Sequence, residues 1–206
     1  MKRCVIVGGA DILDYNSIKK YLRADDFAVF CDCGLRHSLG LDVKPDLIVG
    51  DFDSSENPEL NVETIVLPCE KDDTDTFFAA KEAIKRGFEE FLIIGAIGQR
   101  LDHTLGNVSI LKMLFEKGFK ALIADEYTEM QIVGEKPLYI DDSYPFFSLL
   151  NIFGNAKGIE VKNAKYPLEN AEIATDYQYG ISNEVIKGFT ASVSVAQGRL
   201  LLIKVK

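Results

Sequence analysis

The sequence predicts an α/β region followed by an all-β region. Short apolar runs alternate with helical patterns up to about residue 127, and no convincing helical pattern follows from there to the end. We therefore expect residues 1–127 to form an open, mostly parallel sheet with helices on both faces. We expect residues 128–206 to form a separate antiparallel domain, a β-sandwich or a barrel-like fold. The boundary falls between residues 126 and 135.

Strands and helices are expected to alternate along the first region. The expected strands are RCVIV (3–7), which runs into Gly8-Gly9, then 27–31, 47–49 and 62–67. A short helix is expected over 16–23, with Asn16 or Ser17 as its cap. Two longer helices are expected to begin within DDTDT (72–76) and within QRLDHT (99–104), and to end at Gly87 and around Gly118. The strands FLII (91–94) and ALIA (121–124) follow these helices, so the same α-to-β connection occurs twice.

The second region consists of apolar and alternating runs typical of β-strands. These runs are FFSLLNIF (146–153), GIEVKNAKY (158–166), ASVSVAQ (191–197) and GRLLLIKVK (198–206). The last two are expected to pair as a hairpin that turns near Gln197-Gly198.

Composition excludes several classes of function. The net charge of −9 disfavours nucleic acid and anionic membranes as partners, because both require Lys and Arg to neutralise phosphate. No apolar run is long enough to span a bilayer, and the apolar start is too short for a signal peptide, so we expect a cytoplasmic protein. With four cysteines in no zinc-site spacing and two histidines, His37 and His103, a zinc site is poorly supplied with ligands.

Acidic residues gather where the expected strands end and the helices begin. Asp32 follows one strand, Asp51 and Asp53 follow the next, and Asp75 and Asp102 open the two longer helices. Each alone is an ordinary cap or turn former. In extended backbone, however, Asp51 and Asp53 would point to one side, and two close carboxylates repel each other unless a cation lies between them. Mg²⁺ is the natural cation, since it prefers hard oxygen ligands and bridges to substrate phosphates.

Donors for a phosphate are also present, although the P-loop and G-x-G-x-x-G patterns are absent. In GAIGQRLDHTLGN (95–107), Gly95 and Gly98 let the backbone approach an anion at a helix N-terminus, and Arg100 can pair with phosphate. Lys71 is a second candidate, or a solvated lysine. His103 is either a general base or a structural residue that holds the helix start by hydrogen bonding.

The order of these segments resembles that of thiamine pyrophosphokinases. PDLIVGDFDSS, KDDTDT, GAIGQRLDHTLGN and the later KYPLEN and GISNE occur in the family's order, and the resemblance spans residues 1 to about 200. It implies transfer of the pyrophosphoryl group of ATP to the hydroxyl of thiamine, giving thiamine diphosphate and AMP, with Mg²⁺ assisting. It also implies a homodimer whose active site lies between the α/β domain of one subunit and the β domain of its partner.

The resemblance assigns roles residue by residue. It implies that Asp51, Asp53, Asp75 and Asp102 serve Mg²⁺ and catalysis together with Arg100, and that Asp32, Lys71, Thr74 and Arg100 bind ATP. It implies that Tyr166, Ser182 and Asn183 bind thiamine, with the Tyr166 ring stacking on the pyrimidine. Without the resemblance, these three residues would be a half-buried strand residue and a turn.

Two segments depart from the family pattern. Cys33 adds a side chain in CDCG where the family has glycine, which affects the expected contact at Asp32, and Gln99 replaces a glycine in the expected phosphate loop. Two rival functions remain open on the sequence alone. One is pyrophosphoryl transfer to another alcohol, such as a hydroxymethyl pterin. The other is a non-catalytic nucleotide or thiamine sensor, which would be expected to lose some of the acids or the arginine that this chain keeps.

Overall fold

The chain folds into two compact units, Met1–Glu126 and Tyr127–Lys206. The structure is a computed structural model and describes residues 2–52, 61–70, 72–177 and 179–206. The described helices, of which α4 with 16 residues is the longest, include no candidate for a membrane span.

The first unit is built on a parallel sheet with the strand order β4-β3-β2-β1-β5-β6. The strands are β1 (Arg3–Val7), β2 (Phe27–Cys31), β3 (Leu47–Gly50), β4 (Glu63–Val66), β5 (Glu90–Ile94) and β6 (Lys120–Ala124). The central strands are continuous apolar runs because helices cover both of their faces. The expected strands are therefore confirmed to within a residue or two.

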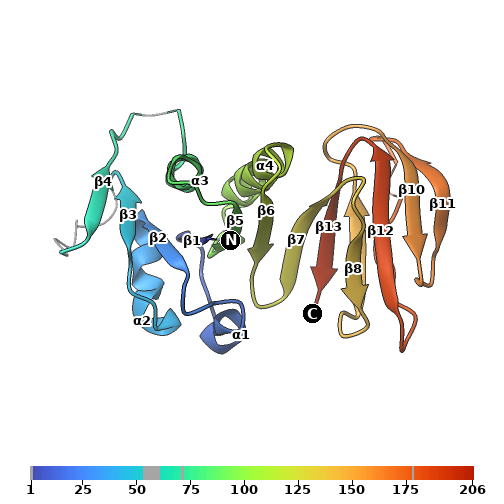
Figure 1. The fold of residues 1–206 in the computed structure, drawn as a ribbon, viewed down its shortest axis with the longest axis horizontal. Coiled ribbons are helices and arrows are strands. Elements are labelled where there is room, and N and C mark those ends of the chain that lie inside the picture. The colour runs from blue at the N-terminus through green and yellow to red at the C-terminus, as the bar shows by residue number, and fades with distance from the viewer. Residues whose placement is uncertain (1, 53–60, 71, 178) are drawn as a thin grey trace. The chain divides into compact units, whose positions relative to one another are not determined.

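Helices lie on both sides of this sheet, as predicted (Figure 1). They are α1 (Tyr15–Lys19), α2 (Ser38–Leu41), α3 (Asp75–Lys85) and α4 (Leu101–Glu116), with the 3-10 helix η1 (Asp32–His37) leading into α2. Ile18 and Leu41 pack with Val5 and Val7 on one face, whereas α3 contacts β1, β2 and β3 on the other. Along β1, successive side chains point to opposite faces, so one strand serves both layers.

The first helix differs from its prediction. It is shorter than the expected 16–23, and its cap is Asp14 rather than Asn16 or Ser17. The Asp14 carboxylate accepts hydrogen bonds from the backbone N–H groups of Asn16 (2.9 Å) and Ser17 (3.3 Å). These bonds satisfy donors that the first turn of a helix leaves open.

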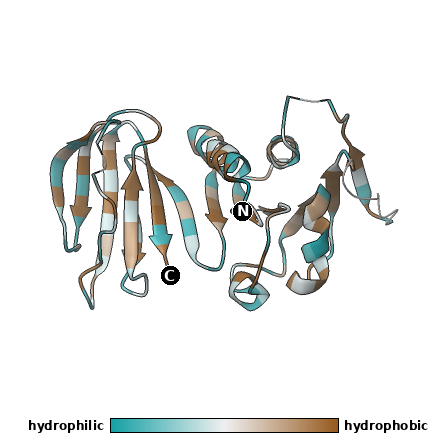
Figure 2. Cartoon of the chain, turned by 180° about the vertical axis from the view of Figure 1, so that it is seen from behind, coloured by the Kyte–Doolittle hydropathy of each residue, from teal (hydrophilic) through white to brown (hydrophobic). Residues whose placement is uncertain are grey.

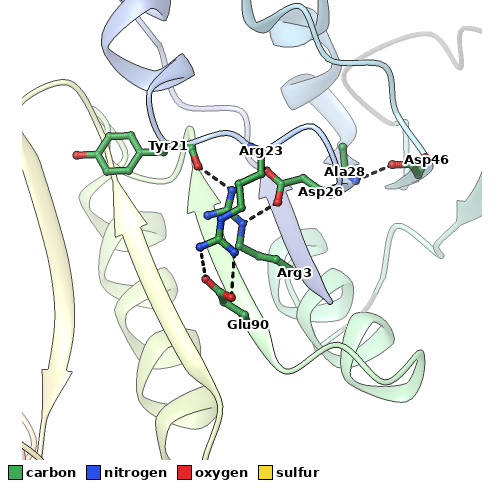
Figure 3. Close-up of polar contacts among 7 residues, drawn as sticks. All are labelled: Arg3, Tyr21, Arg23, Asp26, Ala28, Asp46 and Glu90. Atoms are coloured by element: carbon green, nitrogen blue, oxygen red, sulfur yellow. Dashed lines mark hydrogen bonds and ion pairs between the residues drawn. The ribbon is translucent and has the colours of Figure 1, made fainter. Parts of the chain in front are cut away.

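Charges at the amino ends of the strands are paired with one another (Figure 3). The Arg3 guanidinium donates to both carboxylate oxygens of Asp26 at 2.7 and 2.6 Å, and both side chains are nearly buried. Arg23 forms a similar two-pronged pair with Glu90 at 3.1 and 2.7 Å. The charged side chains named here at the amino edge of the sheet already pair with one another. In open parallel sheets, ligands bind at the opposite, carboxyl edge.

The second unit is a sandwich of two antiparallel sheets, with strand orders β7-β13-β9 and β11-β10-β12-β8. The strands are β7 (Thr128–Val133), β8 (Leu138–Asp141), β9 (Phe146–Leu150), β10 (Ala156–Lys162), β11 (Leu168–Ile173), β12 (Thr190–Gln197) and β13 (Leu200–Val205). Figure 2 shows hydrophilic and hydrophobic residues alternating along them. Both sheets contribute to one core, through residues such as Phe147 and Leu202 from one and Ile159 and Val193 from the other. The described part of this unit contains no helix, as expected.

The predicted hairpin at Gln197-Gly198 is wrong. β12 pairs with β10 and β8, whereas β13 pairs with β7 and β9, so the short turn carries the chain from one sheet to the other. Gly198 has a φ of +85°, and a β-carbon there would lie 2.5 Å from the carbonyl oxygen of Asn155. Sequence proximity alone suggested pairing, but the buried faces of both strands meet in the sandwich core instead.

Candidate functional site

A cavity of about 600 Å³ lies at the carboxyl ends of the strands in the first unit. The strand order places β2 on one side of β1 and β5 on the other, and the chain changes direction at this point. Open parallel sheets bind ligands at such a switch point. The loops after β1 and β5 are joined there by two backbone hydrogen bonds, Gly8 N–H to Ile94 O (2.8 Å) and Ala10 N–H to Gly95 O (2.9 Å).

Glycines allow the backbone to come close around the cavity. A β-carbon on Gly8 would lie 2.5 Å from the carbonyl oxygen of Gly95, and Gly95 itself has a φ of +59°. A β-carbon on Gly50 would lie 3.0 Å from the β-carbon of Asp32. Gly98 also lines the cavity, as expected from the sequence. Such walls leave backbone groups accessible to an anion.

Three carboxylates meet at the cavity wall. One oxygen from each of Asp32, Asp51 and Asp75 lies within 4.8 Å of the others, and all three residues are half-buried. Asp32 begins η1 after β2, Asp51 follows β3, and Asp75 is the first residue of α3. Their positions at the ends of neighbouring strands and at a helix start bring them together. Three hard oxygen donors at this spacing fit a divalent cation such as Mg²⁺.

The backbone has a positive φ at Asp32 and at the residue after Asp51. Asp32 itself has a φ of +35°, and Phe52, which follows Asp51, has a φ of +54°. The expectation of extended backbone from Asp51 to Asp53 is therefore wrong at Phe52. Asp53 and Lys71, both predicted as site residues, lie outside the described residues. Non-glycine residues in this region of φ are held there by their surroundings and cluster at functional sites.

Thr74 and Arg100 also line the cavity. The Thr74 hydroxyl accepts a hydrogen bond from the Phe77 N–H (3.3 Å) and so caps α3. Arg100 donates to both oxygens of Asp102, at 3.0 and 2.6 Å, and these bonds lower the pKa of Asp102. Both side chains are mostly exposed. Among the described acids, Asp102 is not part of the carboxylate group that was predicted to include it.

The predicted thiamine residues lie in the second unit. The Tyr166 side chain is 58% exposed, whereas Asn183 is buried. The Asn183 amide accepts a hydrogen bond from the Tyr166 N–H (3.0 Å) and donates one to the Tyr166 carbonyl oxygen (2.8 Å). Asn183 thus pairs with the Tyr166 backbone as a neighbouring strand would. Ser182, with a φ of +56°, donates its N–H to the Ser148 hydroxyl (3.0 Å).

Comparison with known proteins decides which family this arrangement represents. Residues 18–123 match the family described as "Thiamin pyrophosphokinase, catalytic domain", and residues 137–200 match "Thiamin pyrophosphokinase, vitamin B1 binding domain". The chain belongs to the thiamin pyrophosphokinase family. As a thiamin pyrophosphokinase, it is a transferase that transfers the pyrophosphoryl group of ATP to thiamine.

Individual thiamin pyrophosphokinases resemble the chain along most of its length. A thiamine pyrophosphokinase of Bacillus subtilis is 29% identical over 163 residues, which cover 75% of this chain and 76% of that protein. The crystal structure of a thiamine pyrophosphokinase from the same organism has a TM-score of 0.86 at 25% identity and covers 100% of this chain and 99% of its own. A thiamin pyrophosphokinase structure from Geobacillus thermodenitrificans has a TM-score of 0.83 at 27% identity, with coverages of 99% and 97%.

Several residues at the thiamin pyrophosphokinase cavity were not predicted. Arg36 lines it from η1, and Asn107 and Thr104 line it from α4. Asn107 is buried and donates to the Ala96 carbonyl oxygen (2.8 Å), which fixes the loop after β5. Residues 32–41 carry no clear helical periodicity, so the sequence offered no reason to place Arg36 here. Asn107 occurs in the quoted segment 95–107, and its position in the second turn of the helix that follows a glycine loop could have identified it.

Cys33, the departure noted in the sequence, lies at the cavity wall. Its thiol donates a hydrogen bond to an Asp32 carboxylate oxygen at 3.2 Å. This hydrogen bond and partial burial raise the pKa of the Cys33 thiol. Gln99, the second departure, also lines the cavity.

Proposed function

We propose that Asp32, Asp51 and Asp75 hold Mg²⁺ and that the triphosphate of ATP binds in the glycine-lined cavity beside Arg100. One observation carries the proposal: three half-buried carboxylates approach within 4.8 Å at the wall of this cavity. Carboxylates at this spacing repel one another, and a bound cation would offset that repulsion. Asp53 and Lys71 remain candidates from the sequence for the same metal and ATP roles.

The reaction is an in-line displacement at phosphorus. The thiamine hydroxyl oxygen forms a bond to the β-phosphorus of ATP, the bond from that phosphorus to the oxygen shared with the α-phosphorus breaks, AMP leaves, and the hydroxyl proton is released. When bound, Mg²⁺ neutralises phosphate charge. The chain's own residues supply positioning: backbone N–H groups of the glycine loops approach the phosphates, and the guanidinium of Arg100 pairs with phosphate oxygens.

Thiamine binding is assigned to the second unit. The exposed ring of Tyr166 can stack on the pyrimidine of thiamine, with the Ser182-Asn183 turn beside it. Further exposed apolar and aromatic side chains, among them Tyr177, Tyr179 and Phe189, support a surface that is covered in an assembly. We therefore propose a homodimer in which the α/β unit of one subunit and the β unit of its partner form one active site. From the sequence we also propose a cytoplasmic location.

The decisive experiment is product analysis after mixing the purified protein with ATP, Mg²⁺ and thiamine. We expect AMP and thiamine diphosphate in equal amounts, with loss of both products on chelation and in Asp51→Asn. ADP with thiamine monophosphate would overturn the proposed site of attack. A hydroxymethyl pterin serves as the competing alcohol. Faster turnover with the pterin than with thiamine would contradict thiamine as the substrate.

The shared active site has its own test. Asp51→Asn and Tyr166→Ala damage different halves of the proposed site. At a thiamine concentration well below the wild-type KM, the Asp51→Asn homodimer should be nearly inactive and the Tyr166→Ala homodimer should keep only about a tenth of the wild-type rate. After subunit exchange, mixed dimers should regain activity, because one of their two sites is then intact. Absence of any recovery, with exchange verified by native mass spectrometry, would contradict a site shared between subunits.

A further inference from the structure

Arg36 is a cavity residue to which neither the sequence patterns nor the proposed mechanism assigns a role. It lies near the end of η1, which follows β2, and its side chain is half-exposed at the cavity wall. One nitrogen of its guanidinium, Nη2, donates to the carbonyl oxygen of Gly9 at 2.7 Å and to a carboxylate oxygen of Asp11 at 2.6 Å. The side chain is thus held against the loop that follows β1.

The charges that line the cavity make this position informative. The described lining contains four acids, Asp11, Asp32, Asp51 and Asp75, and two arginines, Arg36 and Arg100. Three of the acids form the proposed cation site. A triphosphate brings further negative charge, so it needs positive groups in addition to the metal.

The two arginines come from opposite sides of β1. Arg36 follows β2, Arg100 follows β5, and the sheet order is β2-β1-β5. Each is also held by an aspartate outside the carboxylate group, Arg36 by Asp11 and Arg100 by Asp102. A ligand at the switch point would therefore meet a guanidinium from either side.

We propose that Arg36 is a second phosphate-binding residue, which contacts the β- or γ-phosphate of ATP and is prepositioned by the Gly9 carbonyl oxygen and by Asp11. This inference rests on the proposed function, because it assumes that the triphosphate enters this cavity. The known contacts of Arg36 use Nη2, together with a long contact from Nε to His37 (3.4 Å). A guanidinium has five N–H donors, so donors remain for phosphate oxygens. The exposed ion pair with Asp11 contributes little by itself, and a phosphate can share or replace it.

The alternative is that Arg36 only ties the β1 loop to η1. The two explanations differ for Asp11→Asn. If Arg36 binds phosphate, removing the competing carboxylate leaves phosphate affinity unchanged or increases it, whereas Arg36→Gln decreases it. If Arg36 is only a tie, both variants loosen the same loop, and both decrease affinity.

The test is calorimetric titration of the full-length protein, with Mg²⁺, using α,β-methylene ATP, whose α–β linkage cannot be cleaved. We expect Arg36→Gln to weaken binding of this analogue roughly 10- to 100-fold, as for loss of a hydrogen bond to a charged group. We expect a much smaller change for AMP, which lacks the β- and γ-phosphates. Arg23→Gln is the matched control, because it removes the same charge from the amino edge of the sheet and should leave binding unchanged.

The outcomes separate the inference from the function on which it rests. Equal weakening for AMP and for the analogue, or wild-type affinity in Arg36→Gln, would overturn the role of Arg36 while the analogue still binds wild type. An equal loss of analogue affinity in Asp11→Asn would also overturn the phosphate-binding role, because it would show that Arg36 only holds the β1 loop against η1. If wild type binds no analogue at all, the proposed ATP site fails and the role of Arg36 falls with it. Circular dichroism of each variant verifies that it is folded.

Discussion

A β-carbon on Gly8 would lie 2.5 Å from the carbonyl oxygen of Gly95, closer than real β-carbons approach an atom. The two residues directly follow β1 and β5, the neighbouring strands at which the chain changes its direction across the sheet. Each strand therefore needs a residue without a side chain where it leaves the sheet. The same close approach that joins the two loops exposes their backbone to the cavity.

Gly8→Ala should consequently damage both stability and ATP binding. The added methyl group meets backbone rather than a flexible side chain, so the β1 loop must shift, and we expect a loss of about 1–3 kcal/mol in the free energy of unfolding. Urea denaturation and titration with α,β-methylene ATP measure the two effects. Gly106→Ala is the control: it lies inside α4 with open space around it, and alanine there should stabilise the protein by up to about 1 kcal/mol. Wild-type behaviour of Gly8→Ala would contradict this account of the switch point.

The strands of the first unit could be predicted because strands that are buried on both faces are apolar at nearly every position of the sequence. Residues 4–7 of β1 and Phe27–Cys31 of β2 are uninterrupted apolar runs, since both faces of the sheet are covered. Residues 32–41 fold as a 3-10 helix and a single helical turn, too short to show periodicity. The turn at Gly198 was misjudged because alternation identifies a strand but not the sheet to which it belongs.

The site was predictable to the extent that sheet geometry dictates it. Asp32 and Asp51 follow neighbouring parallel strands, so their meeting follows from strand order. Asp102 opens a helix just as Asp75 does, and the sequence treats them alike. They differ because the guanidinium of the neighbouring Arg100 donates hydrogen bonds to both carboxylate oxygens of Asp102. Local pairing of this kind depends on side-chain direction at a helix start, which a residue pattern does not specify.

Asp102→Asn should therefore affect KM for ATP, whereas Asp51→Asn should affect the Mg²⁺ requirement. If Asp102 orients Arg100, its replacement weakens the hold on the guanidinium, and we expect KM for ATP to rise by less than roughly tenfold, as for loss of an exposed ion pair. The Mg²⁺ concentration needed for half-maximal activity should not change. Asp51→Asn should raise that concentration or abolish activity. A large shift in the Mg²⁺ requirement of Asp102→Asn would restore Asp102 as a metal ligand.

His37 should make stability depend on pH. The residue is buried, its Nε2 donates to the Ala10 carbonyl oxygen (2.9 Å), and its Nδ1 then accepts from the Tyr15 hydroxyl (2.8 Å), as a neutral ring does. Burial lowers the pKa of His37; the hydrogen bond to Ala10 offsets part of this shift, and the nearby Arg36 adds to it. The unfolded chain therefore takes up a proton below about pH 6.5, where the folded chain still does not. Stability falls as pH decreases from about 6.5 to the folded-state pKa.

The measurement is the free energy of unfolding in urea between pH 5 and pH 8. His37→Gln should flatten the acid side of the curve while lowering stability by about 1–3 kcal/mol, because a buried hydrogen-bonding partner is changed. His103→Gln, the other histidine, is the comparison variant. An acid slope that survives in His37→Gln would assign the pH dependence to other groups.

Asn183 offers a test of how the second unit presents Tyr166. Both ends of the buried Asn183 amide are occupied by the backbone of Tyr166, and the amide oxygen also accepts from the Glu184 N–H at 2.9 Å. The side chain is thus committed to holding the segment that carries the aromatic ring. We expect Asn183→Asp to lower stability by about 1–3 kcal/mol, because a carboxylate cannot donate to the Tyr166 carbonyl oxygen. KM for thiamine should rise with it, since the ring is no longer fixed, while affinity for α,β-methylene ATP should stay unchanged.

Tyr166 variants separate positioning from contact. Tyr166→Phe keeps the ring and should retain thiamine affinity, whereas Tyr166→Ala removes the stacking surface and should raise KM for thiamine roughly tenfold, as for loss of an aromatic contact. Because the Tyr166 side chain is mostly exposed, neither change should lower stability much. If Asn183→Asp raised KM for thiamine at undiminished stability, its amide would contact thiamine directly, and the internal hydrogen bonds would have to break on binding.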